Sequence, residues 1–170
     1  MTRNIRLLSI VIPSVMLVAG VSAQHPTGTQ HPTAQHQGAH PVMGFDIDKT
    51  AHHFYLYEDG GAIEVSVKDK NDKTNLDGIR THLTEAAMMF THGHFEAPEA
   101  VHAPASVAGL EDLIKLKDKV KYVYVETPMG GRVDIVTTDK DALTAVHAFL
   151  KFQIEEHKTG DKTTAAKRRK

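Results

Sequence analysis

The chain has 170 residues, a formal net charge of −1 and no cysteine, which excludes disulfide bridges and thiolate nucleophiles. Residues 42–160 hold 13 Lys and Arg against 20 Asp and Glu, a balance of −7, which argues against a nucleic-acid surface. That segment is long enough for one ordinary domain, and we expect a single domain there.

The first 23 residues have the pattern of a secretory signal peptide. Arg3 and Arg6 precede the uncharged run LLSIVIPSVMLVAGV, and Val21-Ser22-Ala23 supplies small residues for cleavage. The alternative is an uncleaved anchor, although the run is shorter than the about 20 residues of a membrane span. We expect a periplasmic or secreted protein whose mature chain starts near Gln24 and has no transmembrane segment.

Residues 24–41, QHPTGTQHPTAQHQGAHP, form a His- and Pro-rich tract without charged or large apolar residues. Such a composition cannot build a core, so we expect the tract to be disordered. Spaced imidazoles on a flexible chain bind transition metals, whereas a plain polar linker is the alternative. The candidate metal ligands in the tract are His25, His31, His36 and His40.

Residues 42–160 repeat one ββα pattern. AHHFYLYE and AIEVSVK flank the first Gly-Gly pair, and KYVYVETP and RVDIVTT flank the second, which predicts two β-hairpins with Gly-Gly turns. Each hairpin leads into a segment with apolar residues at helical spacing. The first stripe is Leu76, Ile79, Leu83, Ala86, Ala87 and Phe90, and the second is Leu143, Val146, Leu150, Ile154 and His157. Gly93 and Gly160 are the predicted C-terminal caps.

The predicted fold is therefore α+β: two ββα units form an antiparallel four-stranded sheet with two main helices on one face, a two-layer sandwich. Between the units, FEAPEAVHAP is predicted to be extended and is a candidate fifth strand. A short helix is expected around VAGLEDLIKLK.

Alternation along the strands predicts which residues face the helices. The residues predicted to point inward are Phe54, Leu56, Ile63, Val65 and Val67 in the first hairpin and Val123, Val125, Val133 and Ile135 in the second. The tyrosines Tyr55, Tyr57, Tyr122 and Tyr124 are then expected on the uncovered face. Cross-strand pairing that stabilises the sheet is one interpretation. An interface for a second copy or for an envelope protein is the other.

The first predicted helix offers a second set of candidate metal ligands. His82, Glu85, Met89 and His92 fall on one flank of the apolar stripe, and His94 follows the cap. Imidazole beside thioether suits copper, particularly Cu(I), while imidazole with carboxylate suits zinc. The alternative is that the methionine packs and the histidines near the helix end serve its dipole. His82, Met89, His92 and His94 are the candidate ligands for copper or zinc, and no organic cofactor is expected.

Five further histidines are expected at core or boundary positions: His52, His53, His102, His147 and His157. A helix packed over the sheet can nonetheless bring them together. Residues 161–170, DKTTAAKRRK, are predicted to be a disordered basic tail.

The strings MGFDIDKTAHHFYLYEDGGAIEVSVKD, IRTHL, GGRVDIVTT and VHAFLKFQIEEHKTGD resemble a family of small secreted bacterial proteins with no established activity. The resemblance spans residues 43–161. It implies secretion and a single domain, and it assigns no catalytic residue.

Motifs for catalysis are lacking. The sequence has no G-x-S-x-G, no H-E-x-x-H and no phosphate-binding glycine loop, although a His and carboxylate pair for acid–base chemistry stays open. The favoured hypothesis is a secreted or periplasmic binding protein for a transition metal, copper in the first place, with His and Met ligands. The alternative is an interaction or dimerisation module that acts through the tyrosines.

Overall fold

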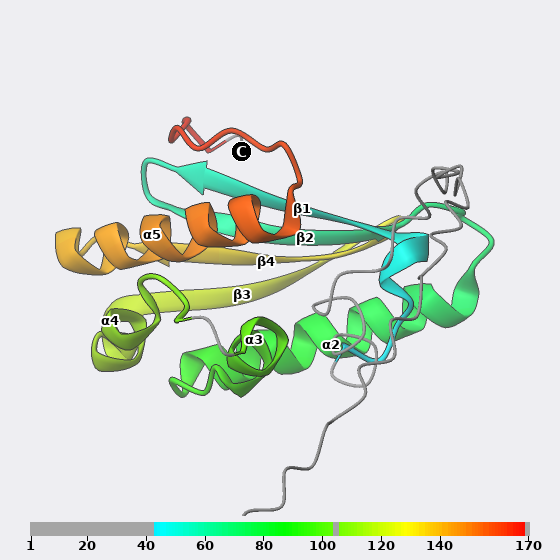
Figure 1. The fold of residues 1–170 in the computed structure, drawn as a ribbon, viewed down its shortest axis with the longest axis horizontal. Coiled ribbons are helices and arrows are strands. Elements are labelled where there is room, and N and C mark those ends of the chain that lie inside the picture. Colours follow the sequence, from blue (N-terminus) through cyan, green and yellow to red (C-terminus); the bar gives the residue numbers. More distant parts are fainter. Residues whose placement is uncertain (1–42, 104–105, 169–170) are drawn as a thin grey trace, which may run out of the picture. The chain divides into compact units, whose positions relative to one another are not determined.

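The computed structural model describes residues 43–103 and 106–168 (Figure 1). The main elements are β1 (Thr50–Tyr57), β2 (Gly60–Val67), α2 (Lys73–Thr91), α3 (Glu96–His102), α4 (Leu110–Lys115), β3 (Val120–Thr127), β4 (Gly130–Thr137) and α5 (Lys140–His157). Short 3-10 turns, η1 (Ile47–Lys49) and η2 (Lys117–Lys119), precede β1 and β3. The four strands form one antiparallel sheet in the order β1-β2-β4-β3. This confirms the predicted α+β fold.

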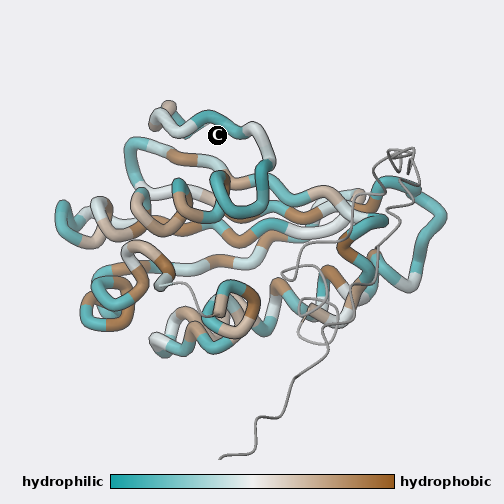
Figure 2. The backbone as a smooth tube through the Cα atoms, in the orientation of Figure 1, coloured by the Kyte–Doolittle hydropathy of each residue, from teal (hydrophilic) through white to brown (hydrophobic). Residues whose placement is uncertain are grey.

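The predicted signal peptide and the His- and Pro-rich tract lie outside the described residues. Across the part of the chain that the structure describes, every helix is too short or too polar to span a bilayer. Hydrophobic and hydrophilic positions alternate along the strands and α2 (Figure 2), as a sheet and a helix with one buried side require.

The two ββα units exchange their helices. α2 packs mainly on β3 and β4, whereas α5 packs mainly on β1 and β2. Two glycines on the inner face make room for this packing: a Cβ at Gly61 would collide with Leu150 of α5, and a Cβ at Gly131 would lie 3.2 Å from Leu83 Cδ1 of α2. Each hairpin is therefore covered by the helix of the other unit, and the two units share one core.

The hairpin turns differ from the prediction. The turns are Glu58–Asp59 and Pro128–Met129, and the Gly-Gly pairs open the second strand of each hairpin. A two-residue turn pairs even-numbered residues of one strand with odd-numbered residues of the next, and cross-strand partners share a face. The face of every side chain in a hairpin follows from this register.

This register corrects the predicted tyrosine face. Tyr122 pairs with Ile135 and Tyr124 pairs with Val133, so both tyrosines lie on the core side, while Val123 and Val125 lie on the outer face. Tyr122 is 8 % exposed and Val123 is 37 % exposed. Burial raises the pKa of Tyr122 above its ordinary value. The outer face therefore holds only the tyrosines of the first hairpin, Tyr55 and Tyr57.

Both main helices begin at aspartate caps. The Asp72 carboxylate accepts a hydrogen bond from Asn75 N at the start of α2, and the Asp139 carboxylate accepts from Asp141 N and Ala142 N at the start of α5. Gly93, at φ 80°, follows the end of α2 as predicted. α5 instead ends at Lys158, which takes the left-handed conformation at φ 52°, two residues before Gly160.

The connection between the units is helical, so the candidate fifth strand was wrong. α3 occupies the segment predicted to be extended, and it begins directly after Phe95, which stacks on Phe90 with ring centres 4.4 Å apart. α3 buries Val101 and His102. This short helix brings His102 into the core, although the sequence predicted an extended segment there.

Residues 161–168, called the C-terminal arm below, lie along the free edge of β1 (Figure 1). Glu58 N donates to Ala166 O at 3.0 Å, and Ala166 N donates to Leu56 O at 3.0 Å. Asp161 starts the arm, and its carboxylate accepts from Phe54 N at 2.9 Å. The predicted disordered tail thus does not describe residues 161–168, which have defined partners on the sheet.

Candidate functional site: a histidine-lined cavity

A cavity of about 160 Å³ lies between α2, α3, α5 and the inner face of the sheet. Much of its wall is apolar, with Phe54, Val65, Phe90 and Phe149 among the lining residues. The polar part of the wall consists chiefly of imidazoles from separate elements. The histidines that line the cavity are His52 of β1, His82 of α2, His94, His102 of α3 and His157 of α5.

Three of these rings form a row. His157 lies between the other two, with its ring centre 5.1 Å from that of His102 and 5.9 Å from that of His52. Phe45 continues the row, because it stacks on His52 at 5.8 Å and meets the edge of His82 at 5.7 Å. The end of α3, the end of α5 and the start of β1 thus bring residues from distant parts of the chain together.

The hydrogen bond of His102 assigns its tautomer. The residue is 4 % exposed, and its Nε2 lies 3.0 Å from Gln153 Oε1. A carboxamide oxygen only accepts, so with Gln153 in this orientation Nε2 carries the hydrogen and Nδ1 keeps a lone pair. This Nδ1 atom is buried and has no hydrogen-bond partner among the described residues. His52 Nε2 and Gln153 Nε2 are buried without a partner there as well.

The cavity keeps its imidazoles neutral. Burial, together with the neighbouring imidazoles of His157 and His82, lowers the pKa of His52 from its ordinary 6.5 to about 3. Burial also lowers the pKa of His82, although the Glu85 carboxylate opposes this shift. Both rings are therefore uncharged at neutral pH, and a neutral imidazole has a nitrogen lone pair to offer to a ligand.

A second cavity of about 320 Å³ lies on the other side of the histidine row. It shares His52, His102 and His157 with the first cavity, and its remaining wall includes Lys68 and Glu156. The three rings consequently border both a mainly apolar cavity and a more polar one.

Three of the four ligands predicted on and after the first helix line the histidine-lined cavity: His82, Met89 and His94. His94 is exposed, and its Nδ1 contacts Glu96 Oε1 at 3.1 Å. His92 does not line the cavity, because it is the exposed C-cap residue of α2, with its backbone N–H directed to Met89 O. The ligands predicted in the tract, His25, His31, His36 and His40, lie outside the described residues.

The predicted interaction face is divided between the two sides of the sheet. Tyr55 and Tyr57 stack on the outer face with ring centres 6.3 Å apart, and His53 continues the stack at 6.0 Å from Tyr55. Tyr122 and Tyr124 belong to the core side. The four tyrosines therefore do not form one surface.

The residues at the centre of the cavity are not among the metal ligands that the sequence predicts. His52, His102 and His157 were expected at core or boundary positions, and Gln153 was not considered. A usable signal was present in α5, where Gln153 and His157 follow the buried stripe at i and i+4. Nothing local to α3 indicated that His102 would join them.

Among residues 43–103 and 106–168, no three His, Cys, Asp or Glu side chains lie close enough together to hold a metal ion. A metal ion can therefore be bound by three of these side chains at once only after the side chains rotate. Comparison of the chain with protein-family models, with curated proteins and with solved structures found no match.

Proposed function

We propose that this chain is a secreted or periplasmic transition-metal-binding protein, with copper as its preferred ion, and that its domain site is the histidine-lined cavity. The observation that supports this most is the state of His102. Its Nε2–H is fixed by Gln153, and its buried Nδ1 lone pair has no partner among the described residues. Histidines that bind metals have this arrangement, in which one nitrogen donates to an oxygen and the other binds the ion.

The neighbouring side chains supply further ligands of the right kind. His157 lies 5.1 Å from His102 between ring centres. Tetrahedral coordination at about 2.0 Å places the ring centres of two histidine ligands about 5 Å apart. His52 and His82 contribute neutral imidazoles, and Met89 contributes a thioether, which favours Cu(I) over Zn(II).

The test is a titration of the mature chain with Cu(I) and with Zn(II), each measured in competition with a chelator of known affinity. Substituting the four tract histidines by Asn leaves one ion bound to the domain. Adding His102→Gln lowers that affinity by about 10- to 100-fold, the range found when a ligand or its orienting partner is lost. Met89→Leu weakens the binding of Cu(I) more than that of Zn(II), because only the soft ion is stabilised by a sulfur ligand.

His92→Ala is the matched control. This histidine stands on the same helix as His82 but outside the cavity, so its loss leaves the affinity unchanged. The proposal fails if His92→Ala weakens binding as much as His102→Gln does, or if the domain binds no ion once the tract histidines are replaced.

Acid release separates the domain site from the tract. Imidazoles with ordinary pKa values lose metal as pH falls through about 6.5 because protons compete for the same lone pair. Protons compete less well for His52 and His82, since burial lowers the pKa of both. The domain therefore retains its ion at a lower pH than the tract does, and the two release steps separate in a pH titration of the loaded protein.

A further inference from the structure

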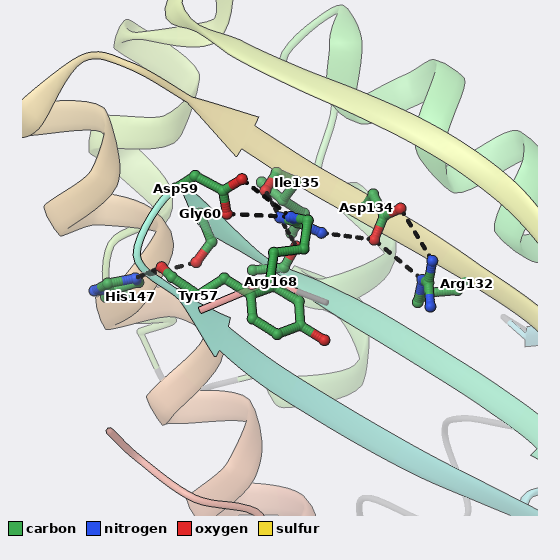
Figure 3. A network of polar contacts seen from close by, with 9 residues as sticks. Tyr57, Asp59, Gly60, Arg132, Asp134, Ile135, His147 and Arg168 are labelled. Atoms are coloured by element: carbon green, nitrogen blue, oxygen red, sulfur yellow. Dashed lines mark hydrogen bonds and ion pairs between the residues drawn. The ribbon is translucent and has the colours of Figure 1, made fainter. Parts of the chain in front are cut away.

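Arg168 of the C-terminal arm is surrounded by acceptors on the outer face of the sheet (Figure 3). Its Nε donates to both carboxylate oxygens of Asp59 at 3.1 Å, and its Nη1 donates to Asp134 Oδ1 at 2.8 Å. Its Nη2 donates to the carbonyl oxygens of Gly61 and Ile135 at 3.1 and 3.0 Å. Each guanidinium nitrogen thus has an acceptor.

The ring of Tyr57 covers the guanidinium, whose central carbon lies 4.4 Å from the ring centre. Acceptors for all three guanidinium nitrogens, with an aromatic ring against the group, match a guanidinium and not an ammonium, which is a compact point charge. The side chains of Tyr57, Asp59 and Asp134 and the two carbonyls of Gly61 and Ile135 are called the arginine site below.

The arginine site is built on the sheet and does not depend on the arm. Asp59 belongs to the turn between β1 and β2, and this turn is tied to α5 because His147 Nε2 donates to Tyr57 O at 2.9 Å and to Gly60 O at 3.1 Å (Figure 3). Asp134 belongs to the central strand β4, and Arg132 Nη2 donates to its carboxylate at 3.3 Å within an ion pair. The acceptors therefore stay in place when the arm leaves.

The arm itself is attached at few points. Asp161 is fixed at one end by His53 Nδ1 at 3.0 Å and by Phe54 N, and Arg168 is fixed at the other. Between them, residues 162–167 are exposed, and within the described part of the chain their backbone hydrogen bonds to the sheet region are those of Ala166 with Leu56 and Glu58. A segment with so few buried contacts opens locally at a much lower free energy than the fold unfolds.

Opening of the arm leaves two carboxylates and two carbonyls without their guanidinium on the outer face of the sheet, next to the exposed edge of β1. We infer that the arginine site binds an arginine of an extended peptide that adds along the free edge of β1, and that the C-terminal arm is its internal competitor. Main-chain pairing with the edge supplies affinity, and the arginine supplies specificity, as in other modes of strand addition. This activity is independent of metal binding and gives Tyr57 of the predicted interaction face a defined ligand.

The test uses the full chain with Arg168→Ala, which frees the site without shortening the protein. The probe is the capped peptide Lys-Thr-Thr-Ala-Ala-Lys-Arg, which has the sequence of residues 162–168. Titration followed by NMR is expected to shift the backbone amides of Tyr57, Asp59 and Asp134. Wild-type protein binds the probe at least tenfold more weakly, because its tethered arm is present at a high effective concentration.

Two matched changes test the chemistry of the site. A probe with citrulline in place of the arginine keeps the shape but loses the charge, and it binds at least tenfold more weakly. Asp134→Asn in the Arg168→Ala protein weakens binding of the arginine probe by a similar factor. Tyr57→Leu, which keeps an apolar residue on the strand, weakens it several-fold through loss of the cation–π contact.

Equal binding of the citrulline and arginine probes would overturn the inference. So would the absence of any shift at Tyr57, Asp59 and Asp134 in the folded Arg168→Ala protein, because the site would then serve only the tethered arm.

Discussion

The histidine-lined cavity and the arginine site both gather polar side chains, yet they differ in how far these groups are satisfied. On the outer face, the guanidinium of Arg168 has an acceptor for each nitrogen, and its charge is balanced by Asp59 and Asp134. In the cavity, His52 Nε2, His102 Nδ1 and Gln153 Nε2 are buried with no hydrogen-bond partner among the described residues.

A buried polar atom without a partner costs free energy, on the order of 1–3 kcal/mol, so folding alone gives no reason to place three of them in one cavity. The arginine site, by contrast, stabilises the structure that contains it. The unpaired atoms support the proposal that the cavity binds a ligand, whereas the arginine site already holds Arg168.

Acid should act on the cavity first. The pKa of His52 is about 3 in the folded protein and near 6.5 in the unfolded chain, so below pH 6.5 the unfolded chain binds a proton that the folded protein does not. The resulting loss in the free energy of unfolding is absent above pH 6.5. It grows as pH falls toward 3, by up to about 1.4 kcal/mol for each pH unit.

The measurement is the free energy of unfolding in urea between pH 7 and pH 4. His52→Phe, which keeps a ring between Phe45 and His157, should flatten the decline with falling pH. An unchanged slope in this variant would mean that other groups set the acid sensitivity.

A double-mutant cycle on His102 and Gln153 should give the next largest effect. His102→Leu leaves the Gln153 carboxamide buried without its partner and is expected to destabilise the fold by about 1–3 kcal/mol. Adding Gln153→Leu removes the second polar group and should restore part of this loss.

Metal affinity should respond differently in the same cycle. Both the single and the double variant lose the His102 ligand, so both lose affinity although their stabilities differ. If affinity instead follows stability through the cycle, the pair is a structural element and the cavity has no role in binding.

The smallest global effect is expected at the arginine site. Arg168→Ala should change the free energy of unfolding by less than about 1 kcal/mol, because the arm lies at an exposed edge and its ion pairs are partly solvated. The local effect should be larger: hydrogen exchange of the Ala166 amide, which donates to Leu56 O, should accelerate strongly. Unchanged exchange would show that the arm is held by contacts other than those of Arg168.

The elements of the fold were predictable because each depends on a local pattern. The stripe from Leu76 to Phe90 predicted α2, and the alternation in AHHFYLYE and AIEVSVK predicted the first hairpin. The face of β3 was not predictable in the same way. In VKYVYVET, tyrosines and valines alternate with each other, so either set can be buried, and the turn at Pro128–Met129 decides between them.

The site was less predictable because its parts are far apart in the sequence. His52, His102 and His157 come from a strand, a short helix and a long helix, and only the packing of α3 and α5 beside β1 brings them together. Arg168 belongs to a basic segment whose composition indicates a solvated tail. Its position is set by Asp59 and Asp134, which are 34 residues or more away in the chain.

The exchange of helices between the two ββα units has a consequence for how the chain acquires its structure. The surface that α2 buries is made of β3 and β4, which follow it in the sequence, and the surface that α5 buries is made largely of β1 and β2. Neither half contains a complete core, so a chain cut between α3 and α4 should yield two fragments that fold only when mixed. In the intact chain, contacts between distant residues must form together, which is typical of domains that fold in one cooperative and comparatively slow step.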